Sequence, residues 1–148
     1  MRNVVITGVG IKSCIGNDYA EVLANLQNAK SGIVFNEKYS EMGFRSCVSG
    51  SVNIDLSEHI ERKLLRFMGE SAGYAYLATK DALKMAGIDD SHLDSPKIGI
   101  VAGSGGASTR VMLESGDIAR EKGPKRIGPY GVTKSMSSSI SAIIATPL

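Results

Sequence analysis

Two clusters of glycine are the first candidates for a ligand-binding site in this sequence. Gly8 and Gly10 directly follow a β-branched run at residues 3–6, where a dinucleotide fingerprint would need a third glycine at position 13. That position is Ser13. The cluster therefore favours a glycine turn that joins a strand to a helix, and it disfavours a small nucleotide-binding protein.

The second glycine cluster, at residues 103–106, follows the apolar run 97–102. A phosphate-binding loop would continue into Lys-Ser or Lys-Thr, and this cluster does not. Because glycine has no Cβ, two interpretations stay open: the backbone approaches a ligand closely here, or it packs tightly against a neighbouring element.

Cysteine and histidine are the next candidates for chemistry. Cys14 and Cys47 are the only thiols, and His59 and His92 are the only imidazoles. Neither cysteine has a histidine or a helix N-terminus placed beside it by the sequence pattern. We predict small buried cysteines and surface histidines. The spacings of a structural zinc site or of a metalloprotease do not occur, so no metal site is predicted.

Two basic clusters are the remaining chemical feature. In a predicted helix at 57–68, Arg62, Lys63 and Arg66 share one face, while the apolar side chains group on another. The second cluster follows a predicted helix at 109–120 and consists of Arg120, Lys122, Lys125 and Arg126. Such charge runs usually mark a solvated face, but two basic patches could also steer an acidic partner.

Composition narrows the function classes. The chain has 148 residues, 17 Lys and Arg, 15 Asp and Glu, and a net charge of +2, which argues against a protein that coats nucleic acid. Hydrophobic residues make up 43%, as in ordinary globular proteins, and no apolar run approaches the ~20 residues of a membrane span. With two cysteines, a disulfide framework is not expected, and the cytoplasm is the expected compartment.

These residues must be positioned by alternating strands and helices. Strands are predicted at 3–6 and 97–102, with a weaker edge strand at 47–52 in an otherwise irregular stretch from 33 to 53. Helices are predicted at 18–29, 57–68, 71–86, 109–120 and 134–145, with Asn17 or Asp18 capping the first and Gly87 ending the third. Residues 89–96 are predicted to form a polar loop. This alternation indicates an α/β layered fold with a parallel sheet.

The predicted sheet is too small for such a fold. Two convincing strands fall well short of the ~5–6 in a mean sheet, and the chain stops directly after a helix. We therefore expect an incomplete fold. Expressed alone, it should expose the apolar faces of residues 98–101 and 136–144 and aggregate, unless the missing half or a second copy covers them.

Five strings of residues, in order along the chain, resemble the N-terminal part of β-ketoacyl-acyl carrier protein synthases, specifically the type I bacterial condensing enzymes. The strings are VITGVGI at 5–11, RKLLRFM at 62–68, AGSGG at 102–106, GPYGVTKSM at 128–136 and Ala-Thr-Pro at 145–147. The resemblance implies a partial thiolase-like sandwich, the N-terminal part of the first half of a duplicated α-β-α-β-α fold. Residues 1–148 would form the N-terminal part of a β-ketoacyl synthase domain that is incomplete at its C-terminus.

The resemblance also implies an activity and partners. Such enzymes work as homodimers and join an acyl group, held on a cysteine, to malonyl on acyl carrier protein, with loss of CO2, in fatty acid biosynthesis. The expected partners are acyl carrier protein, a second copy, and acyl and malonyl thioesters, without nucleic acid, membrane or cofactor. The family's nucleophilic cysteine and its two histidines and lysine match no residue here, and neither Cys14 nor Cys47 stands in for them. The chain alone is therefore expected to be inactive.

Residue by residue, the resemblance carries over binding positions only. Arg62, Lys63 and Arg66 match basic positions that contact the acidic carrier protein, and Arg45, Lys125 and Arg126 are expected to join them. Ala107 and Met136 match positions near the acyl pocket at the dimer interface; the family often has glycine at 107, so Ala107 is expected to narrow the pocket. The alternative is a non-catalytic module of the thiolase superfamily that binds a carrier protein or a condensing subunit.

Overall fold

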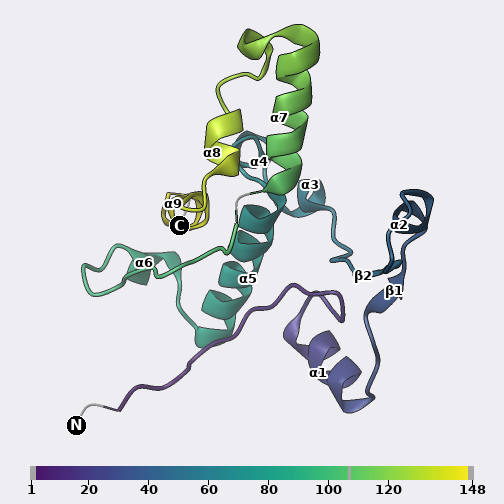
Figure 1. Cartoon of the computed structure of the whole chain (residues 1–148). Helices are drawn as coiled ribbons and strands as arrows, with labels where there is room; N and C mark the ends of the chain where they lie inside the picture. Colours follow the sequence, from purple (N-terminus) through teal and green to yellow (C-terminus); the bar gives the residue numbers. More distant parts are fainter. Residues whose placement is uncertain (1–2, 107, 147–148) are drawn as a thin grey trace.

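The structure is a computed structural model that describes residues 3–106 and 108–146, and its centre is the long helix α5 (Figure 1). The elements are, in order, α1 (Tyr19–Gln27), β1 (Ile33–Phe35), α2 (Glu37–Glu41), β2 (Val48–Gly50), α3 (Leu56–His59), α4 (Arg62–Leu65), α5 (Glu70–Ala86), α6 (Asp90–Leu93), α7 (Thr109–Lys122), the 3-10 turn η1 (Pro124–Arg126), α8 (Gly131–Ser135) and α9 (Ser139–Ala145).

The helix α5 lies at the centre of the core and supplies three of the five residues of its main cluster. It ends at Gly87, whose φ of 68° is a left-handed conformation that glycine adopts without a Cβ clash, so the predicted stop is confirmed. The buried apolar residues that form one cluster on and beside α5 are Ile60, Met68, Ala72, Tyr76 and Leu77. Partly buried side chains from α3, α4 and α9 pack against this cluster. The same face therefore holds both the α3–α4 segment and α9.

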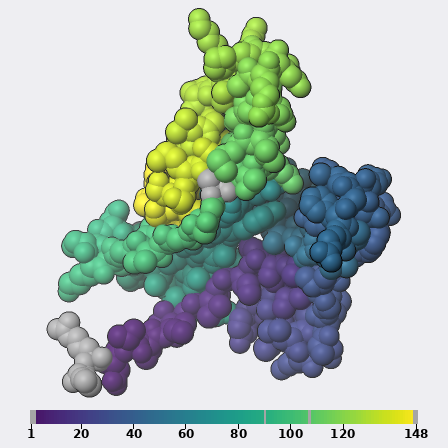
Figure 2. Space-filling view, viewed as in Figure 1, coloured from purple at the N-terminus to yellow at the C-terminus, as the bar shows by residue number. Residues whose placement is uncertain are grey.

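The sheet of the described residues is a two-stranded antiparallel ribbon. β1 pairs with β2 in the register Ile33 to Gly50, Val34 to Ser49 and Phe35 to Val48. This confirms the edge strand predicted at 47–52, whereas β1 and α2 lie in a stretch that was predicted to be irregular. The ribbon and α2 form a lobe apart from α7 and α8 (Figure 2).

The strands predicted at 3–6 and 97–102 are wrong. Within residues 3–106 and 108–146 these segments belong to no ladder, Lys97 lies in a turn, and Val4 and Val101 are 95% and 103% exposed. A β-branched run forms a strand only when a partner supplies the other half of its hydrogen bonds. The parallel sheet predicted from the alternation is therefore not formed among the described residues.

The first glycine cluster is explained by α5. A Cβ on Gly8 would overlap the carbonyl oxygen of Ala82, and one on Gly10 would overlap that of Ala78. The glycines let the extended N-terminal segment lie directly on the helix backbone. The glycine turn predicted at this point is wrong. A turn follows later, where Ser13 and Gly16 exchange backbone hydrogen bonds.

Two predicted helices are each interrupted. The helix predicted at 57–68 is split into α3 and α4 at Ile60, which has extended backbone (φ −126°, ψ 131°) and a buried side chain. The helix predicted at 134–145 is replaced by α8 and α9, with Met136 extended between them. At both Ile60 and Met136 the helix is interrupted, although the apolar residues of the sequence keep a helical spacing through that position.

The remaining helices follow the sequence signals. α1 begins after Asp18, whose carboxylate accepts from the N–H of Glu21, so the predicted cap is confirmed. α7 confirms the helix predicted at 109–120 and continues to Lys122. The polar loop predicted at 89–96 contains the single turn α6.

Candidate functional site

The predicted docking cations are all on the surface. Arg62, Lys63 and Arg66 lie on α4 and just after it, Lys125 and Arg126 lie in η1, and Arg45 lies between α2 and β2; all six are exposed. No salt bridge involves any of them within the described ranges. By contrast, Arg120 of the same predicted cluster is held by Asp117, at 2.9 Å. The six cations are therefore available to an acidic partner.

An aromatic contact joins the segment after α4 to the segment after η1. The rings of Phe67 and Tyr130 meet edge to face, with centroids 4.8 Å apart and planes at 78°. Phe67 follows Arg66 directly and Tyr130 lies four residues after Arg126, so this contact links the chain segments that carry the two basic clusters. Arg45 lies between α2 and β2, and these two elements are separate from α4 and α7 (Figure 1).

An apolar pocket is lined by residues of α4, α8 and α9 and of the segments that follow α4 and α8. Its volume is about 340 Å³, and it is lined by Leu64, Phe67, Met68, Thr133, Met136, Ser138, Ser139, Ala142, Ile143 and Thr146. Met136 therefore lines an apolar pocket, while its expected place near an acyl chain stays a prediction. Ala107, the other predicted pocket residue, lies outside the described residues.

The break between α8 and α9 shapes this pocket. Met136 has extended backbone, and the hydroxyl of the buried Ser139 donates to the carbonyl oxygen of Thr133 across the break. The main chain thus turns between two short helices, and both contribute to the lining. Sequence periodicity missed this break because the apolar spacing from Met136 to Ile144 is that of one helix.

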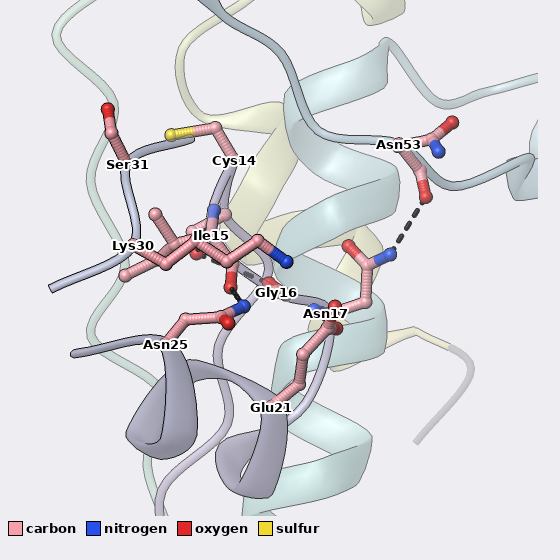
Figure 3. Close-up of a pocket in the computed structure, with 10 residues that line it drawn as sticks. Cys14, Ile15, Gly16, Asn17, Glu21, Asn25, Lys30, Ser31 and Asn53 are labelled. Atoms are coloured by element: carbon pink, nitrogen blue, oxygen red, sulfur yellow. Dashed lines mark hydrogen bonds between the residues drawn. The ribbon is translucent and has the colours of Figure 1, made fainter. Parts of the chain in front are cut away.

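A second pocket, of about 200 Å³, is polar, and it went unrecognised in the sequence (Figure 3). It is formed by residues 13–17 together with Glu21, Asn25, Lys30, Ser31 and Asn53. Asn25 donates to the carbonyl oxygen of Ile15 at 2.5 Å, and Asn17 donates to that of Asn53 at 2.8 Å. The side-chain oxygen of Asn17 is buried and has no partner among the described residues. These amides tie α1 and the segment before α3 to the N-terminal turn.

The cysteines and histidines form no nucleophilic pair. Cys14 and Cys47 are free thiols and half-buried, so the prediction that they are buried is wrong in degree. Cys14 packs against Gly32 and Gly50, while the thiol of Cys47 donates to the carbonyl oxygen of Phe44 at 3.4 Å. His59 and His92 are exposed as predicted, and His92 contacts Asp89 at 2.7 Å.

The second glycine cluster lies in open space. No described atom lies within 4 Å of a Cβ built on Gly103, Gly105 or Gly106, so the interpretation as tight packing is wrong for the described part of the chain. Over the same residues, no three metal-ligating side chains come together. None of the described helices is long and apolar enough to cross a membrane.

Comparison with known proteins assigns the family. The model of the β-ketoacyl synthase N-terminal domain matches residues 1–148, and the chain therefore belongs to the β-ketoacyl synthase family. It is 47% identical to 3-oxoacyl-[acyl-carrier-protein] synthase 1 of Haemophilus influenzae and 44% identical to the protein of the same name from Escherichia coli K12. Each match covers 99% of this chain but only 36% and 37% of those relatives' own length.

Solved structures support the same fold. A β-ketoacyl synthase from Burkholderia phymatum matches 98% of this chain with a TM-score of 0.81 and 21% identity, over 36% of its own chain. A type II polyketide ketosynthase, solved in complex with its acyl-carrier protein, matches 95% of this chain and 37% of its own, with a TM-score of 0.75 and 22% identity. The predicted thiolase-like fold of the N-terminal part is confirmed.

Proposed function

We propose that the protein containing this chain is a β-ketoacyl-acyl carrier protein synthase of fatty acid biosynthesis. It would condense an acyl thioester with malonyl-acyl carrier protein to 3-oxoacyl-acyl carrier protein, with release of CO2. The observation that carries this proposal is the 44–47% identity, over 99% of the chain, to 3-oxoacyl-[acyl-carrier-protein] synthase 1 proteins. The cytoplasm as its compartment and a homodimer as its assembly belong to the same proposal.

Within that reaction, this chain supplies docking and binding surfaces. Carboxylates of an acidic carrier protein would pair with Arg62, Lys63 and Arg66, which no described acidic group engages. Lys125 and Arg126 extend the positive surface, and Arg45 forms a separate contact. Because all six are exposed, the attraction is long-ranged, speeds encounter and weakens as salt rises. No residue of this chain is assigned a catalytic role.

The apolar pocket would hold part of the acyl chain. Met136 lines it, and Ala107, in the segment that leads into α7, is proposed to narrow its approach. Replacing Ala107 with glycine should then widen the range of accepted acyl chains. An unchanged preference in the Ala107→Gly protein would refute the role of this residue.

The test uses the protein at its full natural length. Condensation is measured with malonyl-acyl carrier protein as substrate. The charge-reversed variant carries three substitutions, Arg62→Glu, Lys63→Glu and Arg66→Glu. Its control is Lys97→Glu, which reverses the charge of an exposed lysine outside α4. The triple variant should raise KM for the carrier-bound substrate while leaving kcat nearly unchanged, and the difference should shrink as salt is added.

The alternative, a non-catalytic module, predicts a different pattern. Such a protein would bind acyl carrier protein with the same salt dependence but would form no 3-oxoacyl product. Equal KM values for the triple variant and Lys97→Glu would show that the α4 cations do not bind the carrier protein in the enzyme. Equal affinities for the carrier protein would show the same for a non-catalytic module.

A further inference from the structure

Phe67 lies at once on the docking surface and in the apolar pocket. It follows Arg66 in the chain, lines the pocket and is 42% exposed, so it lies on the rim of the pocket. The next residue, Met68, is buried in the core, and the N–H of Phe67 donates to the carbonyl oxygen of Leu64 at 2.9 Å. The backbone that carries the ring is therefore fixed on both sides.

Tyr130 holds the Phe67 ring in place. Their edge-to-face contact, at 4.8 Å between centroids, restrains the orientation of the ring. Met136 and, from α9, Ala142 and Ile143 line the same pocket. A side chain held between two neighbours cannot swing away without losing those contacts, so it limits the space available to a ligand.

The pocket has the chemistry of a site for an uncharged apolar chain. Not one of the residues that line it carries a charge. One of its hydroxyls, that of Ser139, is already bonded to Thr133. At about 340 Å³, the pocket is at the small end of the ~300–1,000 Å³ typical of ligand pockets. The pocket offers no charged side chain to an ionised headgroup, whereas its apolar side chains would shield methylene groups from water.

We infer that Phe67, held by Tyr130, determines how long an acyl chain this pocket accepts. The inference rests on the proposed function, because that function supplies the acyl chain. Removing the ring opens the rim, so a longer chain can bury further methylene groups. Each methylene that becomes buried should strengthen binding about fourfold.

The test measures binding of octanoate, dodecanoate and hexadecanoate to the full-length protein by calorimetric titration. Phe67→Ala should raise the affinity for hexadecanoate relative to octanoate. The matched control is Phe44→Ala, since Phe44 is also an exposed ring paired with a tyrosine, Tyr39, at 5.2 Å, but it lies in the lobe of β1, α2 and β2. For Phe44→Ala, the ratio of the hexadecanoate affinity to the octanoate affinity should equal that of the wild type.

A second variant narrows the pocket at another of its lining residues. Ala142→Leu adds a side chain to an exposed position of α9 and should weaken hexadecanoate more than octanoate. If both Phe67→Ala and Ala142→Leu leave the ratio unchanged, the inference is overturned. If the ratio is unchanged but the wild type condenses acyl thioesters, only the role of Phe67 is refuted. If the wild type binds no fatty acid and forms no 3-oxoacyl product, the proposed function is refuted as well.

Discussion

The ammonium group of Lys12 lies 2.6 Å from Oδ2 of Asp81, a residue 69 positions further along the chain. The same Nζ donates to the carbonyl oxygen of Asn17 at 2.5 Å, and the Lys12 side chain is only 9% exposed. The pair joins the N-terminal segment to α5, between the glycine contacts on one side and the polar pocket on the other. It therefore fixes where that segment lies along the helix.

Replacing Lys12 with methionine should destabilise the protein by about 1–3 kcal/mol, because two charge-assisted hydrogen bonds are lost from a nearly buried group. The midpoint of urea unfolding measures this change. The matched control is Arg120→Met, whose partner Asp117 is exposed and one helical turn away, and which should cost about 0–1 kcal/mol. Equal losses for the two variants would show that the Lys12–Asp81 pair does not hold the segment.

Gly10→Ala should destabilise the protein by about 1–3 kcal/mol, because its Cβ would overlap the backbone oxygen of Ala78. Gly116→Ala, in the middle of α7, makes the same chemical change where the nearest described atom is 3.8 Å from the new Cβ. It should stabilise the protein by about 0.5–1 kcal/mol through helix propensity. Thermal unfolding of both variants tests the contact, and a stabilising Gly10→Ala would contradict it.

Acid should weaken the caps of the helices α3 and α6. The hydroxyl of Ser57 lowers the pKa of Asp55 below 3.8, and that of Ser91 does the same for Asp89, with help from His92. Since each folded pKa lies below the unfolded one, the stabilisation is complete above the unfolded pKa. It is lost as pH falls through the folded value.

Titration of the Asp55 and Asp89 carboxyl signals by NMR measures these pKa values directly. Ser57→Ala should raise the pKa of Asp55 towards 3.8 and leave that of Asp89 unchanged, which makes Asp89 an internal control. An Asp55 pKa that does not respond to Ser57→Ala would show that this hydroxyl does not stabilise the carboxylate.

Charge reversal at Arg66 should slow association with acyl carrier protein more than charge reversal at Arg45. Arg66 directly follows α4, which carries two further predicted docking cations, whereas Arg45 lies between α2 and β2. At low salt we expect about a tenfold slower association for Arg66→Glu and a smaller change for Arg45→Glu. Stopped-flow association rates decide this, and the order of the two effects is the informative result.

Local signals in the sequence were sufficient for the elements that end on strong caps. α1 and α5 begin and end close to where Asp18 and Gly87 predict. The interruption at Ile60 was not predictable, because its apolar spacing suits a continuous helix and only the burial of its side chain accounts for the extended backbone. Tertiary packing overrides periodicity at that residue.

The candidate site was predictable in its charges but not in its shape. The docking cations follow from residue type and resemblance alone. The contact between Phe67 and Tyr130 joins residues 63 positions apart, and no periodicity relates them. The apolar pocket depends on the break at Met136, which the regular spacing of the neighbouring isoleucines conceals. Sequence periodicity therefore gave no sign of this pocket, and the acyl-binding role of Met136 stays a prediction from the family resemblance.

The seating of Gly8 and Gly10 on α5 has a consequence for how such motifs are recognised. Because each glycine meets a main-chain oxygen, no side-chain substitution on the helix could make room for a larger residue at either position. A spaced glycine pair after a β-branched run can thus persist through evolution for purely steric reasons. Scans that treat such a pair as a mark of cofactor use would misassign proteins built in this way.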